Sequence, residues 1–274
     1  MLSPEIQPQD WAATRSPKTV YQVALPSSWS GCHNVCIPNY DQFAKFYDLV
    51  MGDRGGDGGW VIDCLQRHGK HITSLLELGC GTGSILTRIT AVPSITGLDL
   101  SSQMLALARS RVPNAHLIET DIASFSLGEE FDVVICVFDT LNHLVTFDSW
   151  LSLFAATSSH LPVGGLFMFD VNTQSKLQRL CEGPPWVHEF DNCVIIMDVR
   201  PGEDGITDWD IKIFENIDGP RFELHHELIG QLGVPLEMIK RELSSRFDLV
   251  EESDENGNPP TDGSSRAHFV FRKR

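Results

Sequence analysis

The stretch that most constrains the fold is an apolar strand that runs directly into closely spaced glycines. It reads LLELGCGTGS at residues 75–84 and contains Gly79, Gly81 and Gly83. Glycine lets the backbone turn tightly and approach a ligand, and a helix that begins after such a loop presents free N–H groups to that ligand. We therefore expect a cofactor-binding loop that is followed by a helix.

Short apolar runs alternate with helical segments after this loop, a pattern typical of βαβ units and a parallel sheet. We expect strands at roughly 74–79, 94–99, 115–120, 131–137 and 165–171, and helices near 83–91, 102–111 and 148–161. The later runs alternate apolar and polar residues between turn signals, which predicts an antiparallel sheet. These runs lie at 193–199, 207–214 and 221–228.

The expected fold is therefore α/β, with a Rossmann-like doubly wound sheet of about seven mostly parallel strands. An antiparallel β lid is expected as an insertion after the fifth strand. The first residues are rich in Pro, Ser and Trp without clear periodicity, which indicates an N-terminal arm at 1–38. The domain then covers 39–274, with the inserted lid at about 174–231.

The spacing of the glycines distinguishes between possible cofactors. A dinucleotide fingerprint has the pattern G-x-G-x-x-G, which places its third glycine at position 84. This chain has Ser84 there, and its third glycine is Gly83. Asp99 closes the second expected strand, where ribose hydroxyls are bound in such folds. Asp121 closes the third expected strand, where it can accept a hydrogen bond from an adenine amino group.

Three motifs resemble those of the class I S-adenosylmethionine-dependent methyltransferases. They are ELGCGTG at 77–83, GLDLS at 97–101 and ETDI at 119–122, and the resemblance extends from Tyr40 to Arg274. The segments YDQFAKFYD, FDTLNHL and FDVNT are similar to a branch that modifies small molecules, including amino sugars and glycine-like amines. The resemblance implies a methyltransferase that uses S-adenosyl-L-methionine.

The resemblance also implies which residues bind this cofactor. The methionine portion would be held by Glu77, Gly79, Cys80, Gly81 and Gly83, and faced by Val137 and Phe138. Asp99 would bind the ribose, Leu100 and Met104 would flank adenine, and Asp121 and the backbone of Ile122 would bind its ring. Tyr40 and Tyr47 lie where such enzymes use an N-terminal helix to close over the cofactor. Which of the two tyrosines contacts the cofactor is open.

Two histidines are candidates for catalysis. Methyl transfer from a sulfonium is an in-line displacement, and a general base helps when the acceptor arrives protonated. His143 follows the fourth expected strand, at the carboxyl edge of the sheet, and its ordinary pKa suits proton removal near neutrality. In the expected lid, Phe222, Leu224 and Leu228 share one strand face, and His225 lies on the other, where it could line a cleft.

Composition limits the partners. The formal charge is −16, and the chain has no basic run other than the terminal RKR, which argues against nucleic acid. No stretch approaches roughly 18 uninterrupted apolar residues, and the first residues lack the features of a secretory signal. We therefore expect a cytoplasmic protein without a membrane segment. The seven cysteines are irregularly spaced, and we expect no metal site.

The expected activity is methyl transfer to N or O of a small molecule. The acceptor, the atom that is methylated and the oligomeric state are left open by the sequence. Two other functions compete. A nicotinamide-dependent dehydrogenase shares the fold but conflicts with the position of the third glycine. A protein that binds S-adenosylmethionine without turnover is the other alternative, and it stays open although the intact glycine loop argues against a degenerate site.

Overall fold

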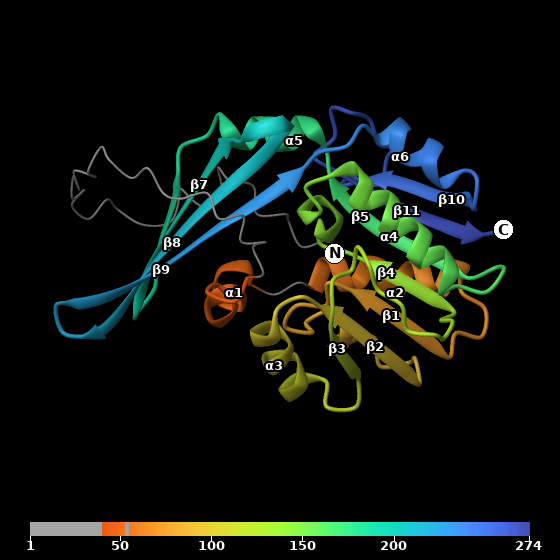
Figure 1. The fold of residues 1–274 in the computed structure, drawn as a ribbon, viewed down its shortest axis with the longest axis horizontal. Helices are drawn as coiled ribbons and strands as arrows, with labels where there is room; N and C mark the ends of the chain where they lie inside the picture. Colours follow the sequence, from red (N-terminus) through yellow and green to blue (C-terminus); the bar gives the residue numbers. More distant parts are fainter. Residues whose placement is uncertain (1–39, 53–54) are drawn as a thin grey trace. The chain divides into compact units, whose positions relative to one another are not determined.

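Seven strands of the described residues form one mixed sheet. The computed structural model describes residues 40–52 and 55–274, and the chain from Pro38 to Arg274 is one unit. The strand order is β10-β11-β5-β4-β1-β2-β3 (Figure 1). Neighbours from β5 to β3 are parallel, and β11 is antiparallel to both β5 and β10. The strands are β1 (Ser74–Leu78), β2 (Ser94–Asp99), β3 (His116–Glu119), β4 (Val133–Cys136), β5 (Leu166–Asn172), β10 (Phe247–Asp254) and β11 (Arg266–Lys273).

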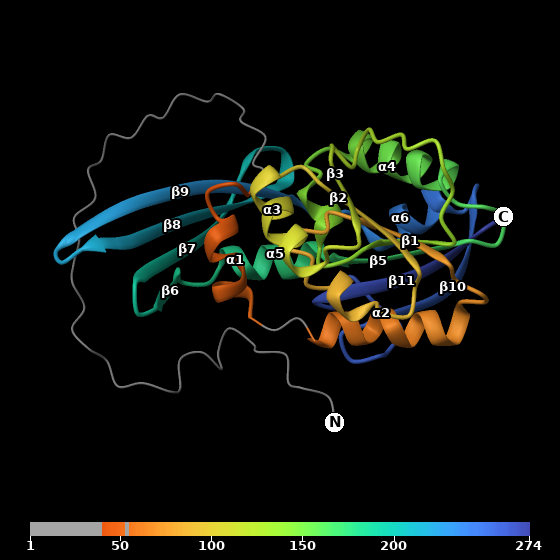
Figure 2. The same cartoon turned by 90° about the horizontal axis from the view of Figure 1, so that it is seen from below.

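Helices cover both faces of this sheet, and Figure 2 shows α2 (Gly55–His68) and α4 (Phe147–Ser159) on opposite sides. One core contains residues of α4 and α6 (Leu236–Leu243), and the other contains residues of α2 and α3 (Ser102–Arg111). Side-chain caps begin two of the helices, because the Ser101 and Thr146 hydroxyls accept from backbone N–H groups. The doubly wound fold with about seven mostly parallel strands is therefore confirmed.

The helix expected near 83–91 is wrong. The chain there makes turns and a 3₁₀ helix, η2 (Leu86–Arg88). Gly83 has φ +76°, which no helix contains, and Pro93 ends the segment a few residues later. In addition, the Thr87 hydroxyl donates to the Ser84 carbonyl and competes with helical bonding. The glycine loop is therefore followed by turns and η2 rather than by the N-terminus of an α-helix.

A separate antiparallel sheet follows β5, as expected. Its order is β6-β7-β8-β9. A short helix, α5 (Gln174–Cys181), precedes it and was not predicted, since its polar sequence has few apolar positions. The strands are β6 (Trp186–Glu189), β7 (Cys193–Pro201), β8 (Ile206–Asp218) and β9 (Arg221–Leu232).

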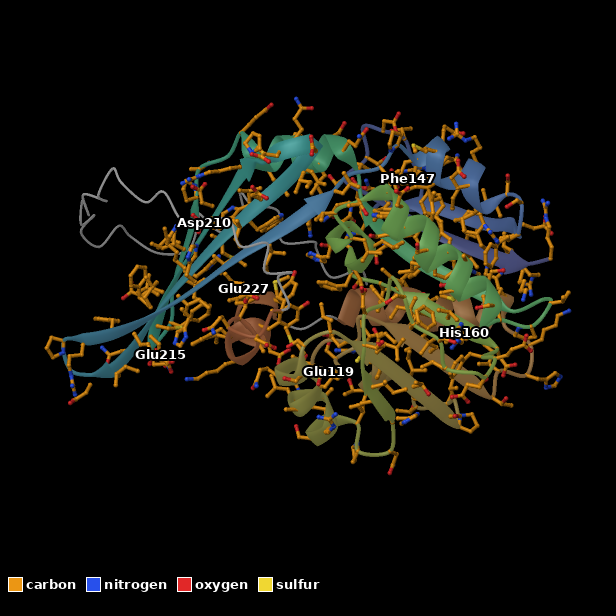
Figure 3. All side chains as sticks on the ribbon, in the orientation of Figure 1. Glu119, Phe147, His160, Asp210, Glu215 and Glu227 are labelled. Carbon is orange, nitrogen blue, oxygen red and sulfur yellow. The ribbon has the colours of Figure 1, made fainter. Side chains whose placement is uncertain are left out.

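One face of this sheet packs against α1 (Ala44–Met51). Phe43 and Phe46 form a core with buried residues of β7, β8 and β9. Glu227 and Glu215 lie on this side and bond to Phe43 and Lys45 (Figure 3). The opposite face exposes about half of the side chains of Phe222, Leu224 and Leu228. Along β9, the buried face is thus the one that carries the acidic residues.

The remaining expectations concern the membrane and the N-terminus. No helix in the described ranges is long and apolar enough to cross a membrane. Among these residues, no group of three His, Cys, Asp or Glu side chains is placed to hold a metal ion. The expected arm at 1–38 lies outside the described residues.

Candidate cofactor and acceptor site

The glycine loop connects β1 to the turns that follow it. Gly79 and Gly81 have φ values of +70° and +52°, a region that L side chains rarely adopt. A Cβ atom on Gly79 would lie 2.4 Å from the Thr140 Cγ2 atom, so the loop and the chain after β4 approach too closely for any other residue. A Cβ atom on Gly81 would meet nothing within 4 Å. The loop is therefore closely packed at Gly79 and open at Gly81.

A buried and a half-buried carboxylate lie beside this loop. Asp99 Oδ2 accepts from the Gly81 N–H at 2.8 Å, and its Oδ1 accepts from the Ser101 N–H at 2.8 Å. Glu77 is 2% exposed, and its Oε2 has no hydrogen-bond partner among the described residues. Burial raises the pKa of both carboxyl groups. Asp99 therefore shapes the loop, and Glu77 retains a free acceptor.

The expected adenine-side residues follow β2 and β3. Asp121 Oδ1 accepts from the Ala123 N–H at 2.8 Å, which closes a turn after β3. Leu100 is 38% exposed, whereas the Met104 side chain is buried. Ile122 packs at the edge of the core under α4. Cys80 is buried, and its N–H donates to the Leu98 carbonyl at 2.8 Å, so this residue joins the loop to β2.

Hydrogen bonds join α1 and the turn before it to the glycine loop and to the residues after β2. The Ser101 hydroxyl donates to Asp41 Oδ1 at 2.6 Å, and the Thr82 hydroxyl donates to Asp48 Oδ1 at 2.9 Å. The rings of Tyr40 and Tyr47 meet edge to face with centroids 6.0 Å apart. The structure thus brings both tyrosines to the side of α1 that packs against the four-stranded sheet.

Tyr40 and His143 form a direct pair. The Tyr40 Oη and His143 Nε2 atoms are 3.0 Å apart, although 103 positions separate the two residues. His143 ends the 3₁₀ helix η3 (Thr140–His143), which follows β4. Burial lowers the pKa of His143, and the Asp139 carboxylate partly opposes this effect. Burial also raises the pKa of the Tyr40 hydroxyl. At neutral pH, the pair is therefore a neutral imidazole and an un-ionised phenol.

The backbone before His143 is unusual. Phe138 and Asp139 have φ values of +74° and +50°, which is uncommon for residues other than glycine. Asp170 on β5 accepts from the N–H groups of both residues, at 2.5 and 3.0 Å. Val137 is buried, and its carbonyl accepts from the Thr140 hydroxyl. Asp170 thereby holds the chain after β4 in a conformation that directs η3 toward Tyr40.

Sequence reasoning missed Arg266 and Gln231, which both bond to Asp139. Arg266 on β11 donates to Asp139 Oδ1 at 2.7 Å and also pairs with Asp170. Gln231 on β9 donates to Asp139 Oδ2 at 2.7 Å. A signal for Gln231 existed, because it shares the alternating face of β9 with Glu227 and the buried Ile229. A polar residue in register with buried positions indicates a specific partner.

The structure does not bring His225 to this site. Its ring lies at the contact between β9 and α1, where Nε2 is 3.1 Å from Glu215 Oε2 and the Phe46 ring centroid is 5.4 Å away. His225 lies five positions before Gly230, whose backbone is next to His143, and an extended strand covers about 17 Å over that length. The position of His225 suits a contact that holds α1 to the sheet.

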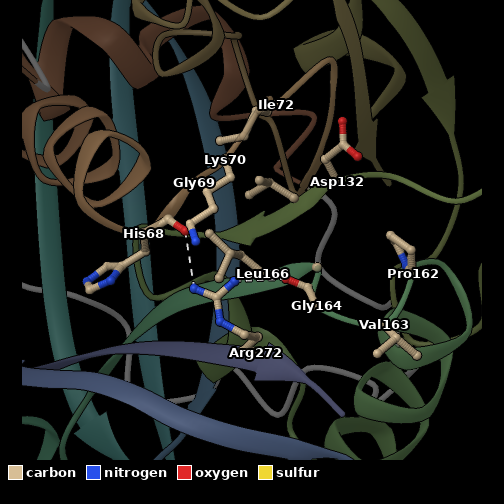
Figure 4. Close-up of a pocket in the computed structure, with 12 residues that line it drawn as sticks. His68, Gly69, Lys70, Ile72, Asp132, Pro162, Val163, Gly164, Leu166 and Arg272 are labelled. Atoms are coloured by element: carbon tan, nitrogen blue, oxygen red, sulfur yellow. Dashed lines mark hydrogen bonds between the residues drawn. The ribbon is translucent and has the colours of Figure 1, made fainter.

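A pocket of about 260 Å³ lies at the opposite, amino edge of the main sheet (Figure 4). Its lining includes Asp132, Leu166 and Arg272. None of the expected site residues contributes to this lining. Apart from His225 and the two tyrosines at α1, the expected residues instead lie where β1, β2, β3 and β4 end, which is the edge that binds ligands in open α/β sheets.

Comparison with known proteins gives matches to methyltransferases over most of the chain. Residues 75–165 match the model of a methyltransferase domain. A provisionally named methyltransferase of Geobacillus sp. (strain WCH70) is 27% identical over 248 residues, which cover 85% of this chain and 99% of that protein. A solved S-adenosylmethionine-dependent methyltransferase from Clostridium acetobutylicum has the same fold, with a TM-score of 0.76 at 22% identity, covering 85% of this chain and 98% of the other.

A third relative has a named substrate. It is the dTDP-3-amino-3,6-dideoxy-alpha-D-glucopyranose N,N-dimethyltransferase of Streptomyces fradiae, 37% identical over 123 residues. The match spans 42% of this chain and about half (48%) of that enzyme. These matches set aside the alternative of a nicotinamide-dependent dehydrogenase. With its glycine loop at the carboxyl edge of a doubly wound sheet, the chain contains a methyltransferase domain and has the fold of S-adenosylmethionine-dependent methyltransferases.

Proposed function

We propose that this enzyme methylates the amine nitrogen of a small molecule and that His143 is the general base. The observation that carries this proposal is the 3.0 Å contact between Tyr40 Oη and His143 Nε2 beside the glycine loop. An aliphatic amine is largely protonated at neutral pH and must lose a proton before its lone pair can attack. The amino-sugar substrate in the name of the Streptomyces relative is consistent with this choice.

The carboxyl edge fits S-adenosylmethionine. The free Glu77 Oε2 atom, the open space at Gly81 and the acceptor oxygens of Asp99 are the groups that such a polar, cationic ligand requires. When bound, the cofactor supplies a methyl group on a positively charged sulfur, which is an activated donor. We propose that it is held by Tyr40, Tyr47, Glu77, Gly79, Cys80, Gly81, Gly83, Asp99, Leu100, Met104, Asp121, Ile122, Val137 and Phe138.

The side chains around His143 have separate tasks in this proposal. Nε2 receives the proton that the acceptor nitrogen loses, and the neutral imidazole is ready to do so because burial lowers its pKa. The Tyr40 hydroxyl contacts the same nitrogen and orients the acceptor amine that approaches Nε2. Asp139, 3.9 Å from Nε2, stabilises the imidazolium that results. Orientation of the reacting groups contributes the rest of the rate acceleration.

The four-stranded sheet and α1 serve as the cover of the site. We assign the catalytic domain to 39–274 and its lid to about 174–231. The Phe43 N–H donates to Glu227 Oε2 at 2.9 Å, and Lys45 pairs with Glu215, so α1 and the lid are held together. Because α1 is also bonded to Ser101 and Thr82, the cover reaches the glycine loop. It excludes water from the acceptor.

A paired substrate screen tests the choice of acceptor. The enzyme is incubated with S-adenosylmethionine and with amino sugars, each matched by the same sugar with a hydroxyl in place of the amine. We expect release of S-adenosylhomocysteine with amines. Replacement of His143 by Ala should lower this rate by about 100-fold or more and leave cofactor affinity unchanged, as is typical of a lost general base. Transfer to the hydroxy sugars alone would refute the proposal.

A further inference from the structure

Gln231 links the lid to the candidate base. It is 3% exposed on β9, and its Nε2 atom lies 2.7 Å from Asp139 Oδ2 and 3.3 Å from His143 Nε2. On its other side, Gln231 Oε1 accepts from the Asn172 amide at 3.3 Å. A buried amide with partners on both sides has one orientation, and that orientation decides what it presents to His143.

Asp139 determines this orientation. Burial by itself raises the pKa of Asp139, but the Arg266 guanidinium is the largest of the nearby charges that outweigh it, and the pKa is held below its usual value. Asp139 is therefore an ionised carboxylate, which only accepts hydrogen bonds. Gln231 must turn its NH₂ group toward Asp139, and the same NH₂ group then faces His143 Nε2. An NH₂ group has no lone pair available to accept a hydrogen from that ring nitrogen.

We propose that Gln231 is a positioning residue that holds His143 in its Nδ1–H tautomer, with the Nε2 lone pair directed toward Tyr40 and the acceptor. A hydrogen on Nε2 would face the Gln231 NH₂ group, which cannot accept it, and would leave the Tyr40 hydroxyl as its acceptor. Tyr40 Oη, 3.0 Å from Nε2, donates to this lone pair in the resting enzyme. This inference rests on the proposed function of His143 as the base, because only the Nδ1–H tautomer leaves Nε2 free to take a proton.

Asn142, the residue before His143, ties the end of the lid strand β9 to η3. Asn142 is fully buried, and its amide donates to the Leu232 carbonyl at 2.9 Å and to the Asn172 carbonyl at 3.0 Å. The end of β9 is thus bonded to the residue before His143, while Gln231 contacts His143 itself. The tautomer of His143 therefore depends on the correct position of the lid strand β9.

Long-range ¹H–¹⁵N correlation spectra of the histidine rings test this directly in the full chain without cofactor. The His143→Ala variant identifies the signals of His143. We expect a protonated Nδ1 and an unprotonated Nε2 in the wild type. In Gln231→Glu, a carboxylate replaces the NH₂ group and should draw a proton to Nε2. In Gln231→Leu, both tautomers should be populated, and kcat should fall about tenfold or more with the KM for cofactor within twofold.

Gln174→Leu is the matched control. Gln174 donates to the Gly233 carbonyl next to the end of β9, and among the described residues its side chain has no hydrogen bond to Asp139 or His143. In the Gln174→Leu variant, the His143 signals should match those of the wild type. This result would distinguish the effect of losing Gln231 from the effect of a loosened lid. An Nε2–H tautomer in the wild type, or unchanged His143 signals in both Gln231 variants, would overturn the inference. Full turnover in His143→Ala would instead refute the base assignment and leave the tautomer result standing.

Discussion

The two ends of β11 each carry an arginine, and the two arginines have different partners. At the carboxyl edge of the main sheet, Arg266 is 9% exposed and binds the carboxylates of Asp139 and Asp170. At the amino edge, Arg272 donates to the backbone carbonyls of Gly164 and His68, at 3.0 and 3.2 Å, beside the pocket of Figure 4. Register explains the placement, since Arg266 pairs with the end of β5 and Arg272 with its start.

This contrast separates a functional edge from a structural one. At the amino edge, Arg272 donates to backbone carbonyls, so its hydrogen bonds are satisfied without a buried carboxylate. At the carboxyl edge, the buried charges hold Phe138 and Asp139 in left-handed conformations next to His143. Buried ion pairs are costly to assemble, and here Arg266 joins two carboxylates beside the left-handed residues. The buried charges and the two left-handed residues occur together because Asp170 stabilises their backbone conformation through hydrogen bonds.

The largest difference between the edges should appear in stability. Arg266→Met leaves two carboxylates buried without their cation and should lower the free energy of unfolding by about 3–5 kcal/mol. Arg272→Met removes two hydrogen bonds at a half-exposed site and should cost about 1 kcal/mol. Denaturant titration of both variants, read by circular dichroism, measures the two values. Equal losses would mean that the two edges do not differ in this way.

A smaller difference should appear in cofactor binding. Asp99→Ala removes an acceptor at the carboxyl edge and should weaken S-adenosylmethionine binding by about 1–3 kcal/mol. Asp132 is the matched aspartate at the amino edge, where Thr73 and Ser74 donate to its Oδ2. Asp132→Ala should destabilise the fold but leave the affinity within twofold. Calorimetry on folded samples distinguishes the two, and equal affinities would remove Asp99 from the cofactor site.

Much of the cofactor side can be predicted from the sequence because its residues are local. Glu77 and Gly81 lie in one motif, and Asp99 ends the next strand of a parallel sheet, so the carboxyl ends of β1 and β2 must bring them together. The helix after the loop was the error there. Apolar periodicity indicated a helix, but Gly83 and the Ser84–Thr87 bond favoured turns over the short distance to Pro93.

The acceptor side is different because its residues come from distant segments. Tyr40 meets His143 across 103 positions, and Gln231 meets Asp139 across 92. No local pattern encodes these pairings, which depend on where the inserted sheet and α1 pack. Even the alternation in β9 was misleading, because the apolar Leu228 faces outward and the acidic Glu227 is buried against α1.

The pH dependence of single-turnover methyl transfer at saturating cofactor tests the role of His143 most directly. Only the unprotonated ring accepts a proton, so the rate should rise with pH through the pKa of His143. Burial places this limb below the ordinary histidine value of 6.5, with Asp139 and the Gly230 backbone opposing the shift. In His143→Ala, the low-pH limb should vanish and the plateau fall about 100-fold. The same limb in the variant, at an undiminished rate, would contradict a catalytic His143.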